Sequence, residues 1–162
     1  RSTLFPYTTL FRSGIAMGFA IVLITGYAWI RELSLALLIP AIPSTLLVGS
    51  IMLTNNIRDI RNDESHGRHT LPIVLGRERA LSLMSISYIF NFIWIIAWIM
   101  VGHMTWFALL AFLAAPLAFK TIHTLSTNTD EFQLDKAMGT TAGAAMIYQL
   151  MWAIGLIMGK LI

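Results

Sequence analysis

The residues best suited to chemistry lie together between residues 55 and 76, which read NNIRDIRNDESHGRHTLPIVLG. This stretch holds two aspartates, one glutamate, three arginines and two histidines, and the sequence on either side of it is strongly apolar. If residues 55–63 continue a helix from the preceding apolar run, successive side chains are separated by about 100° around its axis. Asn55, Asp59 and Asp63 then share one face of that helix.

Two carboxylates one helical turn apart can hold a hard divalent cation. Mg²⁺ typically takes one or two protein carboxylates, keeps some water and completes its coordination with substrate phosphate. Arg58 and Arg68 lie close by in the sequence, and a guanidinium group donates paired hydrogen bonds to phosphate oxygens. The combination favours Mg²⁺-dependent diphosphate chemistry. On spacing alone, the alternative is an ordinary polar loop in which Arg–Asp pairs cap helices and set the topology.

The rest of the chain has the composition of a membrane protein. Of its 162 residues, 57% are hydrophobic and 12% charged, against about 25% charged in soluble domains. A helix needs roughly 17–25 apolar residues to cross the hydrocarbon core of a bilayer. We therefore expect an all-α integral membrane protein with about five transmembrane helices, of which the fourth is short enough to be tilted or partly re-entrant. The predicted spans are 14–30, 33–53, 80–101, 104–119 and 137–159.

The charged residues predict the orientation of the chain in the membrane, and the composition excludes some classes of function. Outside residues 1–13, the connections on one side of the predicted spans carry seven Lys and Arg residues, and the other side carries two. Positively charged loops tend to stay in the cytoplasm, so the loop 55–79 and the connection before the last span are predicted to be cytoplasmic. This bias accounts for the net charge of +3 without a nucleic-acid partner. The absence of cysteine excludes disulfides and Cys-ligated metal sites.

The first 13 residues, RSTLFPYTTLFRS, differ in character from the long apolar runs of the remaining chain. They do not fit a signal peptide, because Pro6 breaks their apolar run and no cleavage site comes after it. They resemble a translated sequencing adapter. We therefore expect residues 1–13 to be a non-native tail and the upstream part of the protein to be missing.

The string from residue 55 onward resembles the second aspartate-rich motif of the UbiA superfamily of prenyltransferases. It is most similar to the form N-N-x-R-D-x-x-x-D-x-x-x-G-[KR]-x-T-L…G of the 1,4-dihydroxy-2-naphthoate polyprenyltransferases of menaquinone biosynthesis. The resemblance covers residues 14–162. The matching motif positions are Asn55, Asn56, Arg58, Asp59, Asp63, Gly67, Arg68, Thr70, Leu71 and Gly76.

The family has about nine spans and an earlier motif of the form N-D-x-x-D-x-x-x-D, which does not occur in this sequence. The resemblance therefore implies that residues 14–162 are the C-terminal part of a UbiA-type prenyltransferase domain, the second half of a nine-helix bundle. Its partner would be the missing N-terminal half of the same enzyme. The acidic stretch 128–135, NTDEFQLD, has a different spacing, and we interpret it as a helix start with capping residues.

The resemblance also implies an activity and a set of site residues. Such an enzyme lies in the bacterial cell membrane and transfers a polyprenyl group from polyprenyl diphosphate to 1,4-dihydroxy-2-naphthoate, giving demethylmenaquinone. Mg²⁺ is the expected cofactor, with Asp59 and Asp63 as its ligands and as the catalytic residues. Arg58 and Arg68 are expected to bind the diphosphate. Asn55 and Asn56 are expected to act there as metal-shell or orienting amides.

Two alternatives remain from the sequence. The first is a UbiA-type enzyme with another aromatic acceptor, such as 4-hydroxybenzoate, homogentisate or a chlorophyllide. The second is a small transporter subunit, but transporters place ionisable residues inside their spans, and the predicted spans contain no acidic or basic side chain. The polar residues within the spans are interpreted as contacts between helices. His66 and His69 are interpreted as solvated loop residues.

Overall fold

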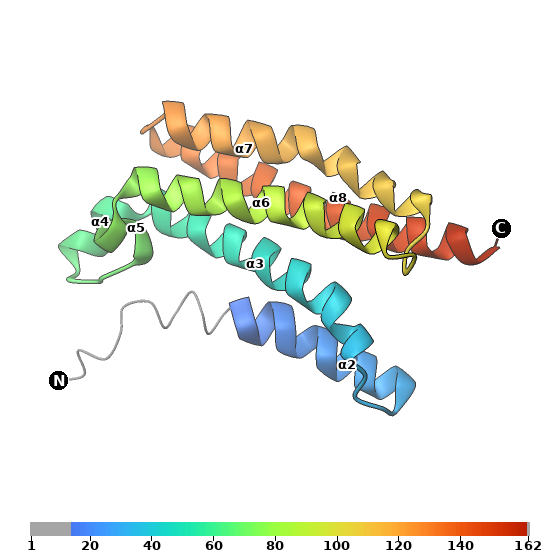
Figure 1. The fold of residues 1–162 in the computed structure, drawn as a ribbon. Helices are drawn as coiled ribbons and strands as arrows, with labels where there is room; N and C mark the ends of the chain where they lie inside the picture. The colour runs from blue at the N-terminus through green and yellow to red at the C-terminus, as the bar shows by residue number, and fades with distance from the viewer. Residues whose placement is uncertain (1–13, 162) are drawn as a thin grey trace. The chain divides into compact units, whose positions relative to one another are not determined.

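The computed structural model describes residues 14–161, which are mostly helical with no strand among them. The predicted non-native tail, residues 1–13, lies outside the described residues. The described chain forms two compact units that divide between Met84 and Ser85, inside one long helix, α6 (Arg77–Met100). Figure 1 shows the order of the helices along the chain.

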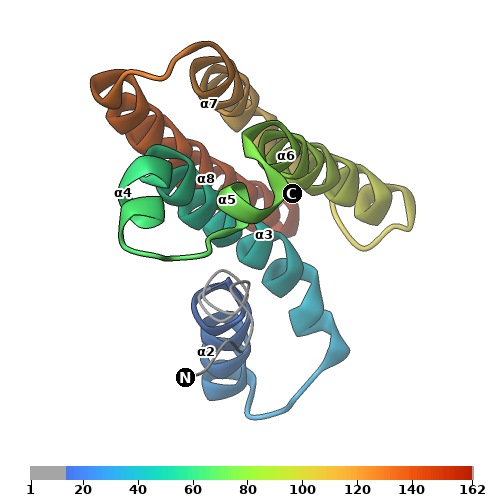
Figure 2. The ribbon, with the colours of Figure 1, turned by 90° about the vertical axis from the view of Figure 1, so that its left-hand side faces the viewer.

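The first unit carries the polar stretch on a series of helices. A π-helix, η1 (Gly14–Ala20), leads into α2 (Ile21–Ile30), and a short 3₁₀ turn, η2 (Leu35–Leu37), leads into α3 (Leu38–Arg58). Two short helices follow, α4 (Ile60–Ser65) and α5 (Leu71–Leu75). They contact each other and α3, and lie beside its C-terminal end (Figure 2).

Within α3, hydroxyl side chains are satisfied by the helix itself. Thr45, Ser50 and Thr54 each donate a hydrogen bond to the carbonyl oxygen four residues earlier, at 2.7, 2.9 and 3.0 Å. A helix surrounded by hydrocarbon has no water to bond its polar groups, so internal pairing lets these residues sit in a membrane span. The polar residues of α3 are therefore compatible with an apolar environment until the helix reaches Asn55.

The second unit contains the rest of α6 and three further helical segments. They are a 3₁₀ helix, η3 (Trp106–Ala114), the α-helix that continues it, α7 (Ala115–Thr127), and α8 (Glu131–Leu161). Ala108, Ala111 and Ala114 are buried along η3. Their spacing of three matches the three residues per turn of a 3₁₀ helix, so they form one stripe. Small side chains on this stripe let η3 pack closely against α8.

A glycine lies where η3 and α8 pack closely together. A Cβ atom added to Gly155 of α8 would lie 2.9 Å from the Cα atom of Ala108 and 2.6 Å from the carbonyl carbon of Phe107. These positions belong to the backbone, which cannot move aside as a side chain could. Gly155 is therefore required by the approach of the two helices.

Among residues 14–161, four helical segments are long and apolar enough to cross a membrane, where about five were expected, and a shorter apolar helix, Ala16–Ile30, lies within the first predicted span. The fourth predicted span, expected to be short at 104–119, belongs to a helical segment of 22 residues that continues to Thr127. The helix that contains the last predicted span, 137–159, begins at Glu131. Asp130 accepts a hydrogen bond from the Gln133 backbone N–H at 3.3 Å, which confirms the predicted helix start. The four segments of span length are Leu35–Arg58, Arg77–Met100, Trp106–Thr127 and Glu131–Leu161.

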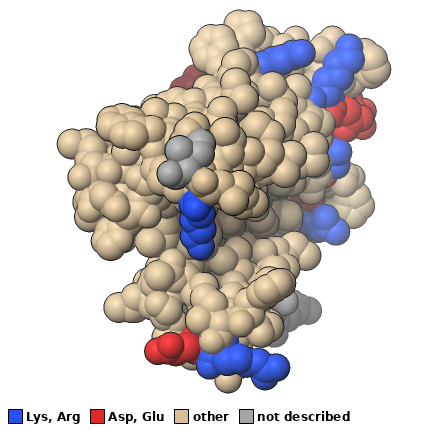
Figure 3. All heavy atoms as spheres, turned by 90° about the vertical axis from the view of Figure 1, so that its right-hand side faces the viewer, with Lys and Arg blue, Asp and Glu red and all other residues tan. Residues whose placement is uncertain are grey.

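The described surface is that of a protein immersed in lipid. Large apolar side chains on several helices are exposed, among them Trp29, Met100 and Trp106. In the view of Figure 3 most surface atoms belong to uncharged residues, and the charged side chains form small separate groups. Together with the long apolar helices, this surface indicates a multi-pass membrane protein.

Candidate diphosphate site at the end of the α3 helix

The two aspartates of the polar stretch lie where α3 passes into α4. Asp59 joins the two helices and has φ −91° and ψ 9°, so the helix is interrupted at this one residue. The hydrogen-bond pattern nevertheless continues, since the Asp59 N–H bonds to the Asn55 carbonyl at 3.0 Å and the Asp63 N–H to the Asp59 carbonyl at 2.8 Å. The expected helical spacing of Asn55, Asp59 and Asp63 is therefore retained across the interruption.

Asp59 is held by its neighbour Arg58. The guanidinium group donates from Nε to Oδ1 of Asp59 at 2.7 Å and from Nη2 to Oδ2 at 2.9 Å, so both carboxylate oxygens are bonded. The same Nη2 also donates to Oδ1 of Asn55 at 2.8 Å. Arg58 thus connects the carboxylate to the amide one helical turn earlier. The role of Asn55 as a metal-shell or orienting amide stays a prediction.

Asp63 is paired with Arg68 through the turn that ends α4. Gly67 has a positive φ of 67°, a conformation that glycine adopts without a steric penalty. Its N–H bonds to the carbonyl of Glu64 at 3.0 Å, and the N–H of Arg68 bonds to the carbonyl of Asp63 at 2.8 Å. This pair of bonds is the Schellman arrangement at a helix C-terminus. It returns the chain toward Asp63, whose Oδ1 accepts a bond from Nη1 of Arg68 at 3.1 Å.

The donor set fits a Mg²⁺ ion that is completed by other ligands. Asp59 and Asp63 are one helical turn apart, and each carboxylate has about four lone-pair positions, so bonding to an arginine leaves positions for a metal. Among residues 14–161, no group of three or more His, Asp or Glu side chains is placed to hold a metal ion. Mg²⁺ commonly has one or two protein carboxylates and takes its remaining ligands from water and phosphate. The pair therefore suits a metal ion whose coordination a diphosphate completes.

The remaining residues of the polar stretch lie around this pair. Asn56 is half-buried beside Asn55, on the same turn of α3. His66 and His69 are exposed, as predicted for loop histidines, and Nδ1 of His66 lies 2.8 Å from the carbonyl oxygen of Asn62. The Thr70 hydroxyl is buried and has no hydrogen-bond partner among the described residues. Thr70 matches the family motif, but no role was predicted for it from the sequence. Its unpaired hydroxyl makes it an additional candidate for contact with a substrate.

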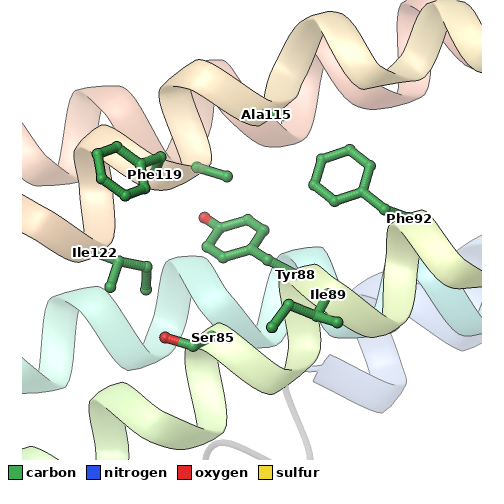
Figure 4. A pocket seen from close by; sticks show the side chains of 8 residues that line it. Ser85, Tyr88, Ile89, Phe92, Ala115, Phe119 and Ile122 are labelled. Carbon is green, nitrogen blue, oxygen red and sulfur yellow. The ribbon is translucent and has the colours of Figure 1, made fainter.

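A separate cavity lies within the second unit, between α6 and α7. Its volume is about 240 Å³. Figure 4 shows Tyr88 and Phe92 reaching toward α7 from α6, and Phe119 on the facing helix. The lining is apolar apart from the hydroxyls of Ser85 and Tyr88. The eight lining residues are Ser85, Tyr88, Ile89, Phe92, Ala115, Ala118, Phe119 and Ile122.

A comparison with known families shows to which of them the chain belongs. The model of the UbiA prenyltransferase family matches residues 5–158, so the chain belongs to the UbiA prenyltransferase family. The match begins within residues 1–13, the segment interpreted as a tail. The expected resemblance of residues 14–162 to this family is confirmed.

Two curated relatives carry the same name. The chain is 32% identical over 152 residues to a 1,4-dihydroxy-2-naphthoate octaprenyltransferase of Bacillus subtilis (strain 168), covering 94% of this chain and 49% of the relative. It is 23% identical over 146 residues to a 1,4-dihydroxy-2-naphthoate octaprenyltransferase of Escherichia coli (strain K12), covering 90% of this chain and 47% of that relative. The chain thus spans about half the length of the curated relatives it matches. No solved structure gives a significant match.

Proposed function

We propose that the chain is the C-terminal half of an integral-membrane prenyltransferase that transfers a polyprenyl group from polyprenyl diphosphate to 1,4-dihydroxy-2-naphthoate. The observation that carries the proposal is the pair Asp59 and Asp63, one helical turn apart at the end of a membrane-length helix and each bonded to an arginine. Membership of the UbiA family supports prenyl transfer. The names of the two relatives support the naphthoate acceptor.

In the proposed mechanism the polar stretch acts on the leaving group. Asp59 and Asp63 would hold Mg²⁺, which when bound supplies positive charge to the departing diphosphate. Arg68 lies in the turn after α4 with an exposed side chain, and it would donate hydrogen bonds to diphosphate oxygens. The bond between the allylic carbon and the diphosphate oxygen breaks, and its electron pair stays with the diphosphate. Fixed positive charge lowers the energy of this step because it faces the place where negative charge develops.

The allylic carbon then forms a bond to the electron-rich ring of the acceptor. The ring carbon that bears the carboxyl group is the proposed point of attack, and the carboxyl group leaves as CO₂. The hydrocarbon chain of the donor needs an apolar site throughout. The exposed apolar side chains of the membrane-length helices and the lipid around them would offer one.

The proposed location is the bacterial plasma membrane, with the loop 55–79 on the cytoplasmic side. This orientation rests on the positive charges of that loop. It would place Asp59 and Asp63 at the membrane surface that Mg²⁺ and the diphosphate group of the donor can reach, while the prenyl chain stays in the hydrocarbon.

The experiment that tests the proposal restores the N-terminal half. Residues 14–162 are fused behind the N-terminal half of the Bacillus subtilis relative, and the fusion is reconstituted in liposomes with Mg²⁺ and octaprenyl diphosphate. We expect a prenylated product from 1,4-dihydroxy-2-naphthoate, detected by mass spectrometry, and much less from 4-hydroxybenzoate or homogentisate. Equal or greater transfer to one of the other acceptors would replace the naphthoate assignment. No transfer to any acceptor would contradict the proposed activity.

A further inference from the structure

The two arginines of the site are held in different ways. Arg58 donates two hydrogen bonds to Asp59 and one to Asn55, and its side chain is only 26% exposed. Arg68 makes one side-chain bond to Asp63, at 3.1 Å, and its side chain is 69% exposed. The first arginine is fixed in place by several bonds to its guanidinium group, whereas the second can leave its partner at little cost.

We propose that Arg58 is a positioning residue that fixes the Asp59 carboxylate for the metal, and that Arg68 is the arginine that moves to the diphosphate. The inference rests on the proposed function and divides its two predicted diphosphate ligands into separate roles. It changes the expectation for Arg58, which acts through Asp59 and does not contact the substrate.

The hydrogen bonds of Arg58 fix the orientation of the Asp59 carboxylate. A carboxylate on a short side chain can rotate, and a metal ligand must be held within a narrow range of orientations. The two parallel bonds from Nε and Nη2 fix the plane of the Asp59 carboxylate, as a bidentate guanidinium does. The bond to Asn55 anchors the guanidinium to the preceding turn of α3. Groups that orient a metal ligand typically change metal affinity by about 10–100-fold when they are removed.

Arg68 compensates the negative charge of the buried Asp63 carboxylate. The Asp63 side chain is only 6% exposed, so its carboxylate needs a positive partner. An arriving cation can supply that positive charge and release Arg68, whose exposed guanidinium loses little by leaving. When the cation replaces Arg68, the negative charge of Asp63 remains compensated. The guanidinium group of Arg68 can then donate hydrogen bonds to the diphosphate oxygens. Arg58 cannot take part in the same exchange without breaking its bonds to both Asp59 and Asn55.

The test uses lysine substitutions, which keep the charge but remove the two-point hydrogen bonding. The fusion described above is prepared with Arg58→Lys, Arg68→Lys or the matched control Arg61→Lys, an exposed position on α4. Binding of Mn²⁺, as a substitute for Mg²⁺, is measured by electron paramagnetic resonance without substrate. The KM for octaprenyl diphosphate is measured separately at saturating Mg²⁺.

We expect Arg58→Lys to weaken Mn²⁺ binding by about tenfold or more, with a KM close to that of the unmodified fusion. We expect Arg68→Lys to leave Mn²⁺ affinity within about twofold and to raise the KM by about tenfold, as expected when a charged hydrogen bond to a substrate is weakened. In an Asp59→Asn background, Arg58→Lys should have no further effect on Mn²⁺ binding, since the group it positions is gone. Arg61→Lys should change neither quantity.

Several results would overturn the inference. If Arg58→Lys raises the KM and leaves Mn²⁺ binding intact, Arg58 is itself a diphosphate ligand. If its effect on Mn²⁺ persists in the Asp59→Asn background, it does not act through Asp59. Should Arg58→Lys fail to fold, as judged by thermal melting, Arg58→Gln replaces it in the same double-mutant comparison. If the unmodified fusion and Asp59→Asn bind Mn²⁺ equally and neither transfers prenyl groups, the proposed function itself fails and the inference fails with it.

Discussion

The substitution Asp63→Asn separates the proposed catalytic role of the acidic pair from its structural role. The exchange keeps the size of the side chain and an oxygen that can accept the bond from Arg68, but it removes the negative charge. Because the Arg68 side chain is 69% exposed, its charge remains hydrated when its partner is neutral. The substitution also removes a charge that is costly to bury, so we expect a loss of stability of only about 1 kcal/mol, the net value of one hydrogen bond.

The expected effect on turnover is much larger. A bound cation contributes several kcal/mol to stabilising the leaving group, and each 1.36 kcal/mol corresponds to about a tenfold change in rate. Loss of about 3 kcal/mol therefore predicts a fall of about a hundredfold or more for Asp63→Asn, and a similar fall for Asp59→Asn. The assay is Mg²⁺-dependent formation of prenylated naphthoate product by the reconstituted fusion, with thermal melting measured on the same samples.

The control for this prediction is Arg61→Gln. Arg61 lies on α4 between the two aspartates and its side chain is exposed. Its loss removes a charge of the loop without touching either carboxylate, so turnover is expected to fall by less than about threefold. Similar small effects from all three substitutions would refute the reasoning. The stretch 55–76 would then be a polar loop that sets topology.

Three further predictions test the fold. Gly155→Ala should lower the stability of the detergent-solubilised protein by about 1–3 kcal/mol, because the added Cβ meets the backbone of η3. Gly139→Ala, on the same helix α8 with nothing within 4 Å, should instead stabilise it by up to about 1 kcal/mol; equal effects on thermal melting would contradict the packing. Tyr148→Phe should lower the stability by about 0.5–1.5 kcal/mol in the same assay, since the Tyr148 hydroxyl donates a buried hydrogen bond of 2.7 Å to a backbone carbonyl of α6. An unchanged melting temperature would argue against that bond. Cysteine introduced at Ser65 should react with an impermeant thiol reagent only from the cytoplasmic side of sealed vesicles, and cysteine at Gly102 only from the opposite side. The reverse pattern would exclude the proposed orientation.

Much of the candidate site could be predicted because helical periodicity places residues four apart on one face. Asn55, Asp59 and Asp63 follow that rule. The partner of Asp59 could not be predicted in this way, because neighbouring residues on a helix point about 100° apart. Arg58 reaches Asp59 at the C-terminal end of α3, where the helix is interrupted and the long side chain can fold back. That contact depends on the backbone of a single residue, which local composition does not specify.

The ends of the helices could likewise not be predicted from the apolar runs alone. Apolar runs located the membrane helices, but α7 and α8 extend beyond them into polar sequence, to Thr127 and from Glu131. A helix that leaves the hydrocarbon can continue in water with charged side chains, so hydropathy marks the apolar part of a helix and not its end. The 3₁₀ winding of η3 was also not predicted. Its spacing of alanines is visible in the sequence, but a three-residue repeat is too short to distinguish from ordinary helical packing.

The winding of η3 has a consequence for how this segment can vary in length. A 3₁₀ helix rises about 2.0 Å per residue and an α-helix about 1.5 Å. The nine residues of η3 therefore make this membrane segment about 4.5 Å longer than the same residues would in α form. Inserting or deleting one residue would turn the alanine stripe by about 120° away from α8, whereas a change of three residues would restore it. Natural variation in this segment is therefore expected to occur in steps of three residues.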